Sequence, residues 1–241
     1  MAESLSDVDV AVDLFVVDAG ESSKSVQTAE RLWQQLLDAN TDRKSVVVAV
    51  GGGVIGDLAG FVAATYARGL TFVQVPTTLL AQVDSSVGGK VAVNLPAAKN
   101  MVGAFWQPSA VIIDTRVLSS LPHREYVAGW GEVVKYGVIQ DADFLAYLEQ
   151  HVDRILARDD ETLRHVIARC CRLKAEVVQD DEREQSGRRA ILNYGHTFAH
   201  ALEAVTGYEQ LLHGEAVAIG MLCASRLAES LHLVDDSFTA R

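Results

Sequence analysis

The chain has 241 residues, of which 49% are hydrophobic and 22% are charged, and its formal net charge is -11. This composition is typical of a globular protein that forms one large domain or two smaller ones. The negative charge argues against nucleic acid or an anionic membrane as the main partner, and the apolar runs are too short to span a bilayer. Because the first residues lack a secretory signal pattern, we expect a cytoplasmic protein.

The first half of the sequence alternates between strand and helix patterns. In chain order we expect a strand end at 13–17, a helix at 25–40, a strand at 45–50, a helix at 54–67, a strand at 71–75, a short helix ending near 83 and a strand at 111–114. Ser23 or Ser25 is a suitable N-cap for the first helix. Strands that alternate with helices predict an α/β fold with a parallel sheet covered on both faces.

A glycine-rich turn separates the second expected strand from its helix in VVVAVGGGVIGD, residues 46–57. Gly51, Gly53 and Gly56 satisfy the G-x-G-x-x-G spacing, in which backbone N–H groups and a helix N-terminus can receive a phosphate. Such turns also serve helix packing, so these glycines alone leave nucleotide binding open. No acidic residue ends a strand about 20 positions later, as an ordinary dinucleotide fold requires.

After Pro122 the pattern changes to long amphipathic segments with few strand signals. We expect helices over 125–139, 143–157, 161–179, 189–205 and 213–231. The domain boundary is predicted near Leu121, which gives an α/β domain over 1–121 and an all-α domain over 122–241.

Four residues of the helical half are candidate metal ligands: Glu132, His196, His200 and His213. One carboxylate and two imidazoles with an open position form a typical catalytic zinc set. His196 and His200 lie four residues apart, on one helix face. The alternative is that these histidines are hydrogen-bonded structural residues.

Lysines in several loops and helices suggest an anionic ligand. Between Val62 and Ile139 the basic residues outnumber the acidic ones, although the whole chain is acidic. Lys90, Lys99 and Lys135 can bind phosphate or carboxylate, or can be solvated surface residues. Gly89-Lys90 is not a P-loop, because Asp84 stands where the first glycine is needed.

The three cysteines, Cys170, Cys171 and Cys223, are odd in number and have no C-x-x-C spacing. They predict neither a disulfide framework nor a cysteine zinc site, and we expect buried, reduced thiols.

Six segments together resemble the signature blocks of the 3-dehydroquinate synthases, members of the sugar phosphate cyclase superfamily. They are GGGVIGDLAG, RGLTFVQVPTTLLAQVDSSVGGK, NLPAAKNMVGAFWQP, GEVVKYG, LNYGHTFAHALE and HGEAVAIGM, and the resemblance covers the chain from about Val12 onward. It implies an N-terminal NAD-binding α/β domain and a C-terminal helical domain that carries zinc or cobalt. The family pattern begins earlier and continues further than this chain, so we expect the start of the first domain and the end of the second to be missing.

The resemblance also implies roles for individual residues. The implied zinc ligands are Glu132, His196 and His213. The positions implied to line the NAD site are Glu21, Lys24, Gly52, Gly53, Asp57, Thr77, Thr78, Asp84, Lys90 and Lys99. The positions implied to bind substrate or take part in catalysis are Arg68, Lys90, Asn100, Lys135, Lys174, Arg189, Asn193 and His200.

The activity implied by this resemblance is the conversion of 3-deoxy-D-arabino-heptulosonate 7-phosphate into 3-dehydroquinate and phosphate. It is a lyase reaction of the shikimate pathway, which leads to chorismate and the aromatic amino acids. A homodimer is a further expectation. The alternatives are another sugar phosphate cyclase, a metal-dependent polyol dehydrogenase of related fold, or an inactive nucleotide-binding module.

Overall fold

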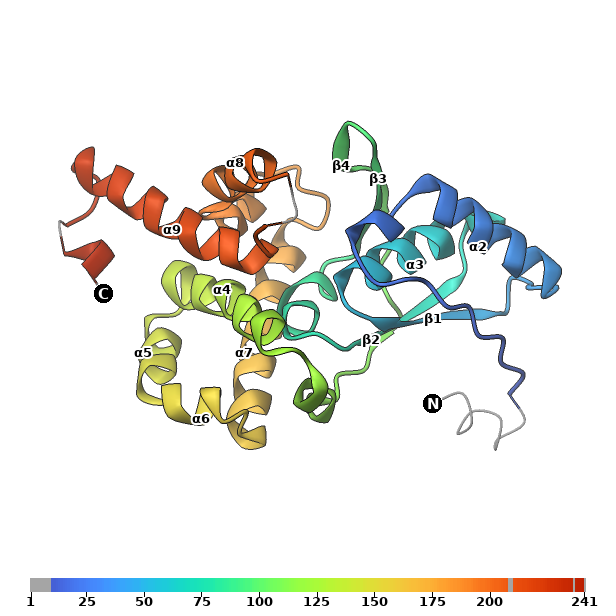
Figure 1. Ribbon diagram of the computed structural model, residues 1–241, viewed down its shortest axis with the longest axis horizontal. Coiled ribbons are helices and arrows are strands. Elements are labelled where there is room, and N and C mark those ends of the chain that lie inside the picture. Colours follow the sequence, from blue (N-terminus) through green and yellow to red (C-terminus); the bar gives the residue numbers. More distant parts are fainter. Residues whose placement is uncertain (1–9, 208–209, 236, 241) are drawn as a thin grey trace. The chain divides into compact units, whose positions relative to one another are not determined.

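The protein is described by a computed structural model that covers residues 10–207, 210–235 and 237–240. These residues pack into two compact units, both drawn in Figure 1. The sheet unit contains the described residues up to Val75 together with Gly89–Ile112, and the helical unit contains Pro76–Gly88 and the described residues from Ile113 onward. The domain boundary near Leu121 stays a prediction; residues 76–88 pack with the helices.

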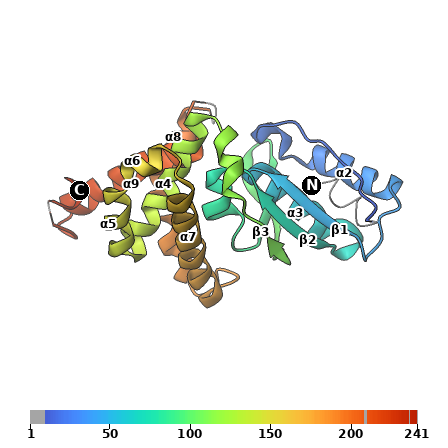
Figure 2. The same cartoon turned by 90° about the horizontal axis from the view of Figure 1, so that it is seen from below.

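The sheet unit is built on a three-stranded sheet. Its strands are β1 (Val46–Gly51), β2 (Thr71–Pro76) and the two-residue β5 (Ala110–Val111), in the order β1-β2-β5. Figure 2 shows β1 and β2 side by side, and β2 pairs with β5 in parallel, with Val73 opposite Ala110. This confirms the predicted α/β class.

Two helices pack in the core of the sheet unit. Helix α2 (Val26–Asp38) begins at the expected cap, where the hydroxyl of Ser25 accepts a hydrogen bond of 3.2 Å from the N–H of Thr28. Helix α3 (Gly53–Thr65) follows β1 directly after the glycine turn. The two helices share one buried cluster with Phe72 of β2, to which α2 contributes Leu32 and α3 contributes Leu58.

An antiparallel hairpin completes the sheet unit, and the sequence patterns did not predict it. It consists of β3 (Lys90–Leu95) and β4 (Ala98–Phe105), with Val91 opposite Ala104 and a register shift between Val93 and Leu95. Val91 and Val93 are buried in the same cluster as α3. The hairpin is therefore anchored to the core of the unit through β3, and it carries Lys90, Lys99 and Asn100.

The helical unit contains six α-helices within its described residues. They are α4 (His123–Gln140), α5 (Ala142–Gln150), α6 (Val152–Leu156), α7 (Asp160–Asp180), α8 (His196–Val205) and α9 (His213–Ser230). The core is formed mainly by α4 and α7, through Tyr126 and Tyr136 on one and Leu163 and Cys170 on the other. The buried hydroxyl of Tyr126 donates a hydrogen bond of 2.6 Å to the carbonyl of Ile155.

Four expected elements differ from the structure. Residues 13–17, all described, form no strand. The helix expected over 143–157 is broken into α5 and α6 at His151, where φ is -117° and ψ is 20°. The helix expected over 189–205 is a 3-10 turn, η5 (Arg188–Asn193), followed by α8, because Gly195 adopts the left-handed region with φ of 80°. The strand expected over 111–114 is shortened to β5, which ends at Val111, and residues 112–114 form no strand. The remaining predicted helices and strands are present.

The three cysteines are free thiols, and only Cys170 is fully buried. Burial raises the pKa of the Cys171 thiol to about 11, so this thiol stays protonated near neutral pH.

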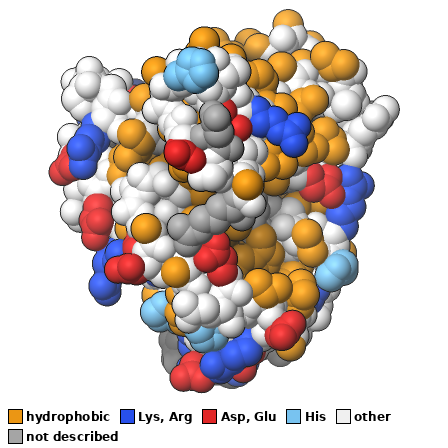
Figure 3. All heavy atoms as spheres, turned by 90° about the vertical axis from the view of Figure 1, so that its left-hand side faces the viewer, with side chains coloured by type: hydrophobic (Ala, Val, Ile, Leu, Met, Phe, Trp, Pro, Cys, Tyr) orange, Lys and Arg blue, Asp and Glu red, His pale blue; other side chains and the backbone are white. Residues whose placement is uncertain are grey.

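In the part of the chain that the structure describes, no helix combines the length and hydrophobicity needed to cross a membrane. Figure 3 shows hydrophobic side chains among charged ones on one face, and α9 leaves Leu222 and Leu227 half-exposed.

Candidate functional site

Helices α4 and α9 contact each other through their backbones, at Gly131 and Gly214. A Cβ atom on Gly214 would overlap the carbonyl of Ala128, and one on Gly131 would overlap the carbonyl of Gly214. Only glycine permits this approach. The residues next to these two glycines are Glu132 and His213, which are thereby brought together.

Helix α8 meets α9 in a similar backbone contact. A Cβ atom on Gly220 would overlap the carbonyl of Gly195, and Gly195 precedes His196, the first residue of α8. This contact places the N-terminus of α8 against the middle of α9. The side chains of His196 and His213 therefore lie close together, with ring centroids 5.4 Å apart.

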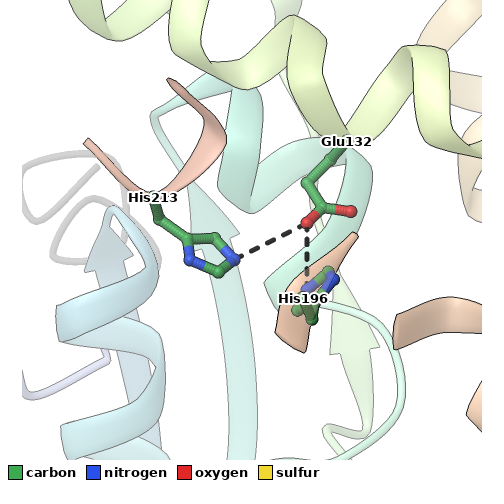
Figure 4. Close-up of side chains that lie close together, drawn as sticks. All are labelled: Glu132, His196 and His213. Carbon is green, nitrogen blue, oxygen red and sulfur yellow. Dashed lines mark ion pairs between the residues drawn. The ribbon is translucent and has the colours of Figure 1, made fainter. Parts of the chain in front are cut away.

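Glu132, His196 and His213 form the candidate metal centre, with one ligand atom from each within 4.8 Å of the others. The Nε2 atoms of His196 and His213 lie 3.4 Å and 3.6 Å from Oε1 of Glu132, and Figure 4 shows both rings directed at this oxygen. Glu132 is fully buried, yet its Oε1 accepts no hydrogen bond from any described residue. Two imidazole nitrogens that converge on a buried carboxylate oxygen without such a bond are typical of a metal site.

His200, the fourth candidate ligand, lies on the same helix as His196 but is not in the three-residue cluster. Its ring centroid is 5.6 Å from that of His196 and 6.4 Å from that of His213. Its side chain is exposed. The geometry therefore separates His200 from the three candidate ligands.

Opposing charges control protonation in the centre. Burial and Asp84 raise the pKa of Glu132, but His213 and Lys135 lower it by more. The pKa is therefore below its usual value, and the carboxylate is ionised. Lys135, one turn along α4, is ion-paired with Glu132. Burial lowers the pKa of His213, whereas Glu132 and Glu203 raise it to about 9; burial lowers the pKa of His196. A metal ion would replace the proton on His213.

Glu203 orients His213, a role that was not predicted from the sequence. The Oε1 atom of this buried carboxylate lies 3.1 Å from Nδ1 of His213, which leaves Nε2 directed at Glu132. A carboxylate on the second ring nitrogen is a frequent partner of metal-binding histidines. The signal was in the sequence, because Glu203 follows His200 by three residues and lies on the same face of α8.

Asp84 joins two predicted substrate cations. It lies in the π-helical turn η3 (Ala81–Ser85), accepts a hydrogen bond of 2.6 Å from the hydroxyl of Tyr136, and is 2.8 Å from Nζ of Lys174. Burial raises the pKa of Asp84, but Lys174 and Lys135 lower it well below its usual range. Asp84 is therefore ionised. It pairs with Lys174 and also interacts electrostatically with Lys135, the lysine that is ion-paired with Glu132.

Arg189 is a buried cation held by its own loop. Its backbone N–H and those of Gln185 and Ser186 donate to the carboxylate of Asp181, at 3.4, 2.7 and 3.1 Å. The bond from Ser186 is the largest cause that lowers the pKa of Asp181 to about 2. The guanidinium Nη1 donates to the carbonyl of Glu182 at 2.9 Å. This loop fixes Arg189, which is 4% exposed.

In the sheet unit, the predicted nucleotide and substrate residues meet at Lys24. Its buried Nζ is paired with Asp57 of α3 and donates a 2.5 Å hydrogen bond to Oδ1 of Asn100. Gly52 is the N-cap of α3 and Gly53 its first residue. The remaining predicted residues of this unit are Glu21, partly buried, Arg68 and Lys90, both exposed, and Lys99, partly buried.

The remaining predicted residues lie in the helical unit. Thr78 caps the turn that leads to Asp84, since its hydroxyl accepts a 3.2 Å hydrogen bond from the N–H of Ala81. Thr77 is partly buried and Asn193, in η5, is exposed. Each unit thus carries its own group of predicted residues.

Two family models match successive parts of the chain. They are described as 3-dehydroquinate synthase N-terminal, over residues 14–128, and 3-dehydroquinate synthase C-terminal, over residues 129–241. The 3-dehydroquinate synthase of Rhodopirellula baltica is 57% identical over 235 residues, which are 98% of this chain and 63% of that protein. That of Thermoanaerobacter pseudethanolicus is 52% identical over 239 residues, which are 99% of this chain and 67% of that protein.

Solved structures give the same grouping. A 2-deoxy-scyllo-inosose synthase complexed with carbaglucose-6-phosphate, NAD+ and Co2+ has a TM-score of 0.92 and 33% identity, over 99% of this chain and 66% of that one. ValA, a 2-epi-5-epi-valiolone synthase from Streptomyces hygroscopicus subsp. jinggangensis with NAD+ and Zn2+ bound, has a TM-score of 0.92 and 31% identity, over 99% and 67%. A glycerol dehydrogenase from Schizosaccharomyces pombe, 20% identical with a TM-score of 0.70, shares the fold alone.

The fold is therefore that of the sugar phosphate cyclases. Within this class, the chain belongs to the 3-dehydroquinate synthase family, because its two family models together cover nearly all of the chain. The chain spans 63% of the length of the Rhodopirellula baltica relative.

The contact at Gly214 leads to a first prediction. We expect Gly214→Ala to force α9 away from α4, to lower the free energy of unfolding by about 1–3 kcal/mol, and to weaken Zn2+ binding at least about tenfold. Ser230→Ala, an exposed change on the same helix, is the control. Denaturant unfolding and Zn2+ titration against a chromophoric chelator measure both effects, and wild-type values for G214A would contradict the proposed role of the contact.

The contact between Glu203 and His213 leads to a second prediction. Glu203→Gln removes the carboxylate charge at Nδ1 and is expected to weaken Zn2+ binding roughly 10- to 100-fold while the fold is retained. Glu176→Gln, which removes an exposed carboxylate from α7, is the charge-matched control. The same titration measures the affinity, and an unchanged E203Q would mean that Glu203 does not orient the ligand.

Proposed function

We propose that this chain carries 3-dehydroquinate synthase activity dependent on NAD and a divalent metal. The substrate is 3-deoxy-D-arabino-heptulosonate 7-phosphate, and the products are 3-dehydroquinate and phosphate. The observation that carries the proposal is the cluster of the buried Glu132 with the partly buried His196 and His213, beside the cations Lys135 and Lys174, in a chain of this family.

The metal fits the residues that are present. An anionic carboxylate and two imidazoles suit zinc or cobalt, and the Oε1 atom of Glu132 has no hydrogen bond from the described residues that a metal would have to displace. Glu132, His196 and His213 would hold the ion. When bound, it would supply Lewis acidity toward a substrate hydroxyl or carbonyl.

NAD fits the glycine turn of the sheet unit. The N-cap of α3 is Gly52, which provides no side-chain hydrogen bond to the first turn of the helix. The N–H groups of that turn are then available to a pyrophosphate, and the helix dipole favours the negative charge. When bound, NAD would supply a reversible hydride acceptor, so that the overall reaction involves no net oxidation.

The substrate carries a phosphate and a carboxylate, and the helical unit has cations for both. Lys135, Lys174 and Arg189 are buried, so water screens their charges little. Asp84 and the Asp181 loop hold Lys174 and Arg189 in place, which reduces the entropic cost of orienting the substrate. The cations position the substrate for loss of phosphate.

His200 and Asn193 are proposed to manage a proton at a substrate hydroxyl. Both are exposed side chains, on α8 and η5, and His200 lies beside the candidate metal centre. An imidazole is the side chain best suited to exchange a proton near neutral pH. The proton lost during elimination leaves with the phosphate. The atoms of the substrate are therefore all found in 3-dehydroquinate and phosphoric acid.

We also propose a cytoplasmic location, supported by three free thiols that a reducing compartment would preserve. The homodimer stays a prediction. A second candidate activity is that of another sugar phosphate cyclase, favoured by the TM-score of 0.92 to the 2-deoxy-scyllo-inosose synthase.

Phosphate release by the purified chain tests the proposal. We expect release from 3-deoxy-D-arabino-heptulosonate 7-phosphate only with NAD and a divalent metal, loss of activity after chelation, and recovery when Zn2+ or Co2+ is added. Phosphate release from glucose 6-phosphate, tested in place of the substrate, would instead support the second candidate activity. No release from either compound, at full metal and NAD occupancy, would reject the proposed activity for this chain.

Two neighbouring arginines provide a sharper test. We expect Arg189→Ala to lower kcat/KM for the substrate roughly 100-fold, because a buried cation would be lost from an anionic ligand. Arg188→Ala removes the exposed neighbour, which pairs with Asp180 at 3.3 Å, and is expected to stay within about twofold of wild type. Equal losses in both variants would contradict a substrate contact by Arg189.

A further inference from the structure

The tip of the β3–β4 hairpin is attached to the segment that precedes α2. The N–H of Asn94 donates a 2.8 Å hydrogen bond to the carbonyl of Lys24, and Asn94 forms an isolated parallel bridge with Ser25. Both segments belong to the sheet unit. The predicted nucleotide residues Glu21 and Lys24 are thus joined through the backbone to the hairpin that carries Asn100.

The side chain of Asn94 makes a second connection between the same segments. Its Nδ2 donates a 2.7 Å hydrogen bond to Oε1 of Glu21, and its Oδ1 accepts one of 2.9 Å from the N–H of Asn100. One amide therefore contacts a predicted NAD residue on one side and a predicted substrate residue on the other.

The bond to the N–H of Asn100 helps to fix an uncommon backbone conformation. Asn100 has φ of 59°, in the left-handed region that asparagine adopts more readily than most residues other than glycine but that remains uncommon. In this conformation its Oδ1 accepts a hydrogen bond from Lys24, whose Nζ is also paired with Asp57. The direction of the Asn100 side chain therefore depends on Asn94 and on Lys24 together.

We propose that Asn94 is a positioning residue that couples occupancy of the nucleotide site to the geometry of the substrate-binding hairpin tip. The inference rests on the proposed function, which assigns Glu21, Lys24 and Asp57 to NAD and Asn100 to the substrate. NAD that contacts Glu21 and Lys24 stabilises the acceptor and donor that hold Asn94 and Asn100. Asn100 is then presented to the substrate in one orientation.

Asn94→Asp separates the two connections. It keeps an oxygen for the N–H of Asn100 but replaces the donor to Glu21 with a second carboxylate, so the two side chains repel. The double variant N94D/E21Q restores a hydrogen bond between the two side chains in the opposite direction. The amide introduced at position 21 donates to the carboxylate introduced at position 94. Asn40→Asp is the matched control: Asn40 is an exposed asparagine of the same unit, with φ of 55°.

Two measurements test the coupling. For N94D we expect the KM for 3-deoxy-D-arabino-heptulosonate 7-phosphate to rise about tenfold, with kcat within about twofold of wild type. Hydrogen exchange is expected to slow at residues 95–101 when NAD is added to wild type or N40D, but not when it is added to N94D. In N94D/E21Q the KM and the NAD-dependent protection should return toward wild type.

The outcomes separate this inference from the proposed function. A wild-type chain that releases phosphate, together with an N94D variant whose KM and NAD-dependent protection are unchanged, would overturn the coupling and leave the proposed function intact. N94D/E21Q no better than N94D would also count against it. A wild-type chain that neither binds NAD nor releases phosphate would overturn both. A purely structural role of Asn94 would lower stability without changing the NAD-dependent difference in exchange.

Discussion

The metal centre depends on how closely α9 approaches α4 and α8. Side chains larger than hydrogen at Gly131, Gly214 or Gly220 would collide with the carbonyl of the facing backbone, so the helices would pack further apart. Helices usually pack 8–10 Å apart, with the distance set by the side chains at the contact. Because the three ligands lie next to such contacts, a small shift of one helix would separate their donor atoms. The same close helix contacts thus determine both the packing of the helical unit and the geometry of its candidate metal centre.

Buried charge is the second recurring feature. Lys24 in the sheet unit and Lys135, Lys174 and Arg189 in the helical unit are all nearly inaccessible to solvent. Burying an ion pair costs more free energy than burying apolar groups of similar size, so fold stability alone does not explain these buried charges. Their partners, such as Asp84, keep them charged and in place. Preorganised cations of this kind are suited to bind the anionic substrate proposed above.

Local patterns predicted most helices and strands, and residue chemistry selected Glu132, His196 and His213 within a set of four. Spacing alone could not remove His200, because it shares a helix face with His196, and only the packing of α9 separates them. The hairpin over 90–105 was missed because its turn and its polar residues interrupt the alternating pattern. Asn94 was missed because its partner, Glu21, is remote in sequence and no local pattern encodes that contact. The spacing of Glu203 from His200 places it on the same face of α8, but only the packing of α9 brings it to His213.

The order of the ligands along the chain has a consequence for biogenesis. Glu132 emerges from the ribosome well before His196, and His213 follows at the first residue of α9. The donor atoms cannot converge until α9 has been synthesised and packed against the two earlier helices. An ion can be held by all three ligands only once α9 has packed against α4 and α8, so binding of the ion stabilises that packing. Capture of an ion by all three ligands during synthesis would then mark the moment at which α9 packs.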